Sequence, residues 1–123
     1  MRTYKALPCL QSLHQLVTLT DEFPSGLAWR TTTRYHEAGA MAGKYVAAKR
    51  YYGIRILGDQ YHAHRIVYYM RTGINPRNAD VVHLKDNPEK DNRKELVLFD
   101  GTNLKIPVKN LRSMKARFKG VKP

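Results

Sequence analysis

The sequence has little of several residue types, and each shortage excludes a class of protein. Cys9 is the only cysteine among 123 residues, so the chain can form neither an internal disulfide nor a zinc–thiolate cluster. No apolar run approaches the roughly 18 residues that span a membrane, and the N-terminus does not resemble a signal peptide. A glycine-rich nucleotide-binding loop is also missing. We therefore expect a cytoplasmic protein with no membrane partner and no small-molecule substrate.

Acidic residues are few as well: the chain has 10, against 22 lysines and arginines, and its formal net charge is +12. Such an excess costs self-repulsion unless a polyanion screens it, and binding to phosphates releases counterions. Residues 26–77 hold nine basic and two acidic residues, 78–102 hold four and six, and 103–123 hold seven and none. This distribution predicts a nucleic-acid partner and, between the basic flanks, oxygen ligands that suit a hard cation.

Apolar spacing and turn residues predict the elements of the N-terminal part. Leucines at helical spacing predict a short amphipathic helix over residues 9–18. Residues 23–26, Phe-Pro-Ser-Gly, indicate a turn, and a short strand follows over 27–30. Residues 31–44 are rich in Thr, Gly and Ala, and we expect a loop that lies along the nucleic acid.

The clearest local pattern predicts a β-hairpin. Apolar and other residues alternate from Tyr52, Gly58-Asp59 can form the tight turn, and a second strand covers 60–63. Two interpretations stay open for this hairpin: a solvated basic face, or a ribbon laid against DNA.

Further elements follow toward the C-terminus. A helix of about two turns over 65–73 ends at a glycine, and a short strand covers 81–84. Residues 95–99 form either a strand or the start of a final helix, and 108–119 predict a separate basic helix.

His83 lies at the end of a predicted strand, and an Asx-rich turn follows it. A histidine in this position can take a proton from water, because its unperturbed pKa lies near neutrality. A divalent ion held by carboxylate and amide oxygens can stabilise the leaving oxygen of a phosphodiester. By itself, however, a lone histidine in a polar turn is usually a surface residue.

A family resemblance adds to this interpretation. Residues 53–73, with "AHR" and "TG" after a hairpin, resemble the stretch that precedes the HNH motif in phage and homing-type HNH endonucleases. Residues 81–93 look like that family's "VDHINGDP…DNR", and 21–30 resemble its "DPETGLLRW" opening. The resemblance covers roughly residues 18–104.

The resemblance implies an α+β fold: a small β-hairpin region plus helices, ending in a degenerate ββα-metal HNH finger. We expect a single domain over 1–123. Its parts are an N-terminal helix and DNA-contacting loop (1–50), the hairpin plus helix (51–73), the HNH-like finger (74–104) and a basic tail (105–123).

The resemblance also implies site residues. His83 matches the general base, Asn87 and Asn92 would shape the loop, and Mg²⁺ or Mn²⁺ would be the cofactor. Asn103 and Glu95 are the leading metal ligands, with Asp86 and Asp80 less favoured. Double-stranded DNA is the expected partner, and the residues predicted to contact it are Lys49, Arg50, Arg55, His64, Arg65, Arg93, Lys109 and Arg112.

The largest departure from the family is Val82, which stands where many members have a metal-binding Asp. Glu95, with Asp80 or Asp86, would supply the missing carboxylate, or Asn103, water and DNA phosphate would hold the metal alone. In the third outcome cleavage is lost and a DNA-binding protein remains. An RNA-binding or ribosome-associated protein is a weaker alternative.

The pair His62 and His64 leaves alternatives too. On a strand both would point to one face and could bind a metal. The favoured interpretation is that His64 and Arg65 order the junction between hairpin and helix or contact phosphate.

Overall fold

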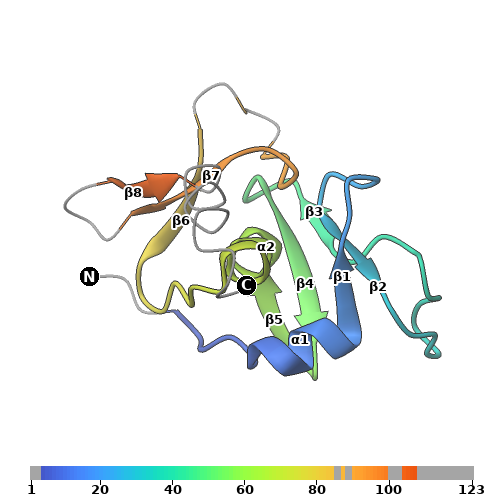
Figure 1. Cartoon of the computed structure of the whole chain (residues 1–123). Helices are drawn as coiled ribbons and strands as arrows, with labels where there is room; N and C mark the ends of the chain where they lie inside the picture. Colours follow the sequence, from blue (N-terminus) through green and yellow to red (C-terminus); the bar gives the residue numbers. More distant parts are fainter. Residues whose placement is uncertain (1–3, 85–86, 88–89, 100–103, 108–123) are drawn as a thin grey trace.

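The computed structural model describes residues 4–84, 87, 90–99 and 104–107 (Figure 1). These residues form two helices and three small antiparallel sheets, an α+β arrangement as expected. None of the helices in this part of the chain is long and apolar enough to cross a membrane. The elements are α1 (Leu10–Leu16), β1 (Val17–Leu19), β2 (Leu27–Trp29), β3 (Lys44–Val46), β4 (Tyr51–Ile56), β5 (Asp59–His62), α2 (Ala63–Thr72), β6 (Asp80–His83), β7 (Leu96–Phe99) and β8 (Leu104–Pro107).

Helix α2 lies at the centre of the fold, where it contacts α1, β1, β4, β5 and β6 (Figure 1). It ends at Gly73 as predicted, since Gly73 adopts φ 76° and donates its backbone N–H to the Tyr69 carbonyl at 2.8 Å. The helix begins two residues earlier than expected, at Ala63, directly after β5. The largest fully buried apolar side chains around it are Tyr68, Leu13, Leu27, Ile54, Ile56, Ile66, Leu96, Val17 and Val67.

The predicted helix over 9–18 is shorter in the structure. Val17 has extended backbone angles and begins β1, which pairs with β2 in the register Val17↔Trp29. A β-branched residue with a fully buried side chain suits a strand as well as a helix, so periodicity alone could not place this boundary. The turn over 23–26 and the strand after it are confirmed, with the Gly26 N–H donated to the Phe23 carbonyl at 2.9 Å.

The β4–β5 hairpin is confirmed, but its turn is one residue earlier than predicted. Ile56 pairs with Asp59, so the turn residues are Leu57 and Gly58, with φ of 52° and 86°. Positive φ at both positions matches the right-handed twist of the flanking strands. A third strand, β3, joins this sheet by pairing Lys44 with Gly53, so the loop predicted over 31–44 reaches the sheet at its last residue.

The third sheet differs most from expectation. Residues 96–99 are a strand, β7, which pairs with β6 and places His83 opposite Leu96. The alternative for 95–99, the start of a final helix, is therefore wrong; β8 occupies 104–107 and pairs with β7. Leu104 and Ile106 alternate with Lys105, a period-two pattern, and Pro107 ends a strand at the sheet's edge. The described residues therefore do not show a ββα finger, and the helix predicted over 108–119 lies outside them.

Candidate active site around His83

His83 ends β6 and is partly buried, with its Nε2 atom 2.6 Å from Oδ1 of Asn92. Asn92 is fully buried, and its own Nδ2 group donates to the Ser25 carbonyl at 3.0 Å. Because that bond uses the amide N–H₂, Oδ1 must face His83, and an amide oxygen only accepts. His83 therefore donates through Nε2–H, which leaves Nδ1 of the neutral ring as the proton acceptor.

A backbone hydrogen bond and the small size of Gly26 also hold Asn92 in this position. Its backbone N–H donates to the Pro24 carbonyl at 2.7 Å, so both its backbone and its side chain are tied to the turn over 23–26. Gly26 lets the two segments approach, since a Cβ at this position would lie 3.1 Å from Val67 Cγ2 and 3.3 Å from Asn92 Cβ. The φ of 81° at Gly26 also favours glycine.

Asn87 closes the loop that carries Asn92. Its side-chain Nδ2 donates to the Asp91 carbonyl at 2.9 Å, and its Oδ1 accepts the Asp91 N–H at 3.0 Å. Asn87 is 1% exposed, so these bonds form away from water, where leaving either group unpaired would be costly. The two loop asparagines that the sequence singled out thus lie in one hydrogen-bonded loop beside His83.

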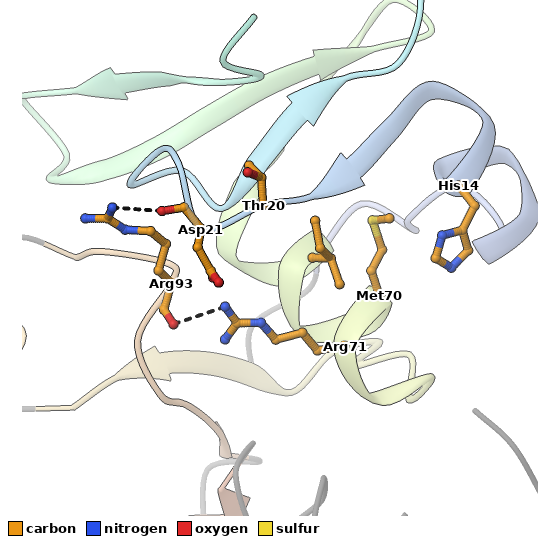
Figure 2. A pocket seen from close by; sticks show the side chains of 7 residues that line it. His14, Thr20, Asp21, Met70, Arg71 and Arg93 are labelled. Atoms are coloured by element: carbon orange, nitrogen blue, oxygen red, sulfur yellow. Dashed lines mark hydrogen bonds between the residues drawn. The ribbon is translucent and has the colours of Figure 1, made fainter. Parts of the chain in front are cut away.

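Arg93 braces the same loop from outside. Its guanidinium holds the Asp91 carboxylate with an Nη2–Oδ2 distance of 2.7 Å, and this bond lowers the pKa of Asp91. Figure 2 shows that Arg93 also donates to the Asp21 carbonyl, at 3.1 Å, while Arg71 of α2 donates to the Arg93 carbonyl at 3.1 Å. Arg93 was predicted to contact phosphate, but its described contacts are structural ones.

A groove of about 600 Å³ brings several predicted residues together on the other side of His83. Lys49 and Arg50 come from the turn between β3 and β4, while His64 belongs to the first turn of α2. Lys90, which sequence analysis did not single out, adds a third cation. We call this the His83 groove, and its lining residues are Tyr4, Lys49, Arg50, Tyr51, His62, His64, Asp80, Val81, Val82, His83 and Lys90.

Three histidines line the groove, and two of them are neutral at pH 7. The His64 ring lies 5.0 Å from the His83 ring and 5.3 Å from the His62 ring, centre to centre. Burial, and then the nearby His83 and His62, lower the pKa of His64 well below its ordinary value. Burial also lowers the pKa of His83, against the opposing effect of its bond to Asn92. Lys49, Arg50 and Lys90 supply positive charge to the groove that does not depend on these two rings.

The described residues include only some of the predicted metal ligands, so the magnesium site stays a prediction. Asp80 lines the groove, but its carboxylate accepts a hydrogen bond from the Tyr4 hydroxyl. Glu95 directly precedes β7, one residue before the partner of His83. Asn103 and Asp86 lie outside the described residues. Within the part of the chain that the structure describes, no group of three or more His, Cys, Asp or Glu side chains could hold a metal. Val82 lines the groove without a ligand atom.

Other predicted DNA contacts lie elsewhere. Arg65 is 3% exposed and donates to the carbonyls of Ala79, at 2.7 Å, and Arg77, while its guanidinium lies 3.7 Å from the centre of the Tyr4 ring. These bonds order the chain beside α2, and the phosphate contact of Arg65 stays a prediction.

Arg55 is exposed but lies outside the His83 groove, near the far end of β4. Lys109 and Arg112 lie outside the described residues.

Of the cations that line the groove in the described part of the chain, Lys90 is the one that the sequence did not indicate. Its only local signal is that it belongs to the polar loop after His83. Comparisons with known protein families, curated proteins and solved structures found no match. What this groove does is therefore inferred from its own residues.

Proposed function

We propose that the protein is a DNA endonuclease of the HNH type that hydrolyses phosphodiester bonds with His83 as general base. The observation that carries this proposal is the bond from His83 Nε2–H to the buried Asn92 Oδ1, at 2.6 Å. It fixes the ring tautomer and leaves Nδ1 ready to accept a proton. The lowered pKa of His83 keeps the ring in its basic form at neutral pH.

The surroundings of His83 support a phosphodiester substrate. Lys49, Arg50 and Lys90 line the same groove and are the groups that would bind the phosphate oxygens. The net charge of +12 favours a long polyanion over a small ester. Double-stranded DNA is therefore the substrate that we propose.

In the proposed step, Nδ1 of His83 accepts a proton from water as the water oxygen attacks phosphorus. The bond from phosphorus to the 3′ oxygen breaks, and that oxygen takes a proton from solvent. The dependence on Mg²⁺ or Mn²⁺ stays a prediction, because two of the predicted ligands, Asn103 and Asp86, lie outside the described residues.

The test is a plasmid cleavage assay with Mg²⁺, Mn²⁺ or EDTA. We expect His83→Ala to cleave at least about 100-fold more slowly than the unaltered protein, the usual contribution of a general base. His14→Ala removes an exposed histidine of α1 and is the matched control, which we expect to retain full activity. Equal rates for the unaltered protein and His83→Ala would refute the assignment of His83.

Val82 favours a second candidate, a DNA-binding protein that no longer cleaves. A valine lines the groove where the HNH family commonly has a metal-binding carboxylate. This candidate predicts salt-sensitive duplex binding without cleavage by the unaltered protein, and nicking by Val82→Asp. Tighter binding to RNA than to duplex DNA would instead favour the RNA-binding alternative.

A further inference from the structure

A second hollow lies at the opposite end of β4 from the His83 groove. Tyr51, at the start of β4, lines the groove, whereas Arg55 and Ile56, at its end, line the second hollow. At about 3.3 Å a residue, the two are separated by roughly 15 Å along the strand. They share no lining residue. We call this hollow the Tyr35 surface and define it by Trp29, Arg34, Tyr35, Lys44, Arg55 and Leu57.

Two large apolar side chains of the Tyr35 surface are mostly exposed to solvent. Tyr35 is 82% exposed, and Leu57, at the tip of the β4–β5 hairpin, is 73% exposed. Leu57 also adopts a φ of 52°, in the left-handed region that leucine rarely visits. Trp29, which also lines this surface, stacks on His36 with ring centres 3.8 Å apart and ring planes 6° apart.

The charged side chains that line the Tyr35 surface all have one sign. Arg34, Lys44 and Arg55 line the surface, and no Asp or Glu does so among the described residues. The Arg34 guanidinium lies 5.7 Å from the centre of the Tyr35 ring. Arg55 donates to the Gly58 carbonyl at 3.0 Å, which holds its cation at the hairpin tip beside Leu57. An occupant must therefore combine a flat apolar part with negative charge.

We propose that the Tyr35 surface binds an unpaired stretch of single-stranded DNA, with a base against Tyr35 and Leu57 and phosphates at Lys44 and Arg55. Every base has a π-face that can stack on an aromatic ring, and the flanking cations follow the backbone. Paired bases in a duplex are stacked on each other and present no free face to Tyr35. An apolar protein partner would bury three cations without counter-charges, which is costly. This binding does not depend on cleavage by His83.

Trp29 provides a direct test, because it is the only tryptophan in the chain and lies within this surface. We expect oligothymidylate of about ten nucleotides to quench Trp29 fluorescence in a saturable way. Tyr35→Ala should raise the Kd at least about fivefold, the loss of one base–aromatic stack. Tyr45→Ala is the matched control: Tyr45 is also exposed, at 43%, but lies on β3 outside the Tyr35 surface.

Further variants separate this proposal from the proposed function. Lys49→Ala and His83→Ala alter the other groove, so we expect both to keep the quenching by oligothymidylate. Loss of quenching in Lys49→Ala would place the single strand in the His83 groove and overturn the proposal. So would an equal loss in Tyr35→Ala and Tyr45→Ala, stronger quenching by duplex DNA, or equal quenching by polyglutamate, which carries charge without bases. Circular dichroism of each variant checks that its fold is intact.

Discussion

The His83 groove and the Tyr35 surface differ in how firmly their side chains are held. Behind the groove, Asn92 is fully buried and joins His83 to Ser25, which lies 67 positions before Asn92 in the sequence. On the Tyr35 surface, the Tyr35 side chain is 82% exposed. Buried hydrogen bonds thus hold the His83 ring in one orientation, whereas the Tyr35 surface presents an exposed aromatic side chain.

This difference matches two kinds of recognition. Proton transfer requires the accepting atom of a base to lie within about 3 Å of the atom that carries the proton, and in a defined tautomer, so a loosely held ring would be ineffective. Stacking of a base on an aromatic ring tolerates every base and many angles. We therefore expect substitutions in the loop behind His83 to damage stability and cleavage together, while those on the Tyr35 surface affect binding alone.

The largest expected effect on stability comes from Asn92→Ala. This change leaves the Ser25 carbonyl and the His83 Nε2–H without their buried partner, and it opens a small cavity. Together these losses should lower the free energy of unfolding by about 2–4 kcal/mol, measured by urea denaturation.

Asn78→Ala is the matched control for that change. Its side chain also accepts a bond across the chain, from the Tyr4 N–H at 3.2 Å, but in an exposed position. We expect a cost below about 0.5 kcal/mol. Equal losses of stability in the two variants would show that the burial of Asn92 adds nothing to its hydrogen bonds, which would contradict the firm attachment assigned to the loop behind His83.

A smaller effect is expected from glycines that belong to the two regions. Gly26→Ala would place a Cβ 3.1 Å from Val67 Cγ2, in addition to the strain of its positive φ. Gly39→Ala, in the loop that carries Tyr35, has a similar φ of 90° but no atom within 4 Å of its Cβ. We expect losses of about 2–3 kcal/mol and about 1 kcal/mol, measured by thermal or urea unfolding. A larger loss for Gly39→Ala would contradict the tight packing assigned to Gly26.

Local signals predicted much of this arrangement. The hairpin, the end of α2 at Gly73 and the strand that carries His83 all follow from short patterns that the structure confirms. Asn87 and Asn92 were likewise singled out from the sequence, and both lie in the loop behind His83.

The remainder depends on contacts between distant residues. Nothing near Ser25 in the sequence indicates that its carbonyl meets Asn92, 67 residues later. Likewise, nothing near Arg65 in the sequence indicates that its guanidinium donates to two backbone carbonyls of the segment after α2. The sequence left residues 95–99 open between a strand and the start of a final helix, because pairing of β7 with β6 and β8 decides that segment and single-sequence patterns do not report pairing.

Stability should also depend on pH, through the histidines of the His83 groove. Burial, the first cause, lowers the pKa of His64 and of His83 in the folded protein. In the unfolded chain both rings titrate near about 6.5. As the pH falls below that value, the unfolded chain takes up protons that the folded protein does not, so the free energy of unfolding must decrease.

We therefore expect stability to be flat above about pH 7 and to fall by at most about 1.4 kcal/mol per pH unit for each histidine between pH 6.5 and its folded pKa. Urea denaturation at half-unit steps from pH 8 to pH 5 measures this slope. His64→Gln should flatten it, because a neutral amide replaces the more strongly shifted ring. His14→Gln removes an exposed histidine of α1 and should leave the slope unchanged. An unchanged slope in His64→Gln would show that His64 does not stay neutral in the fold, and the groove would then carry more positive charge than its lysines and arginine supply.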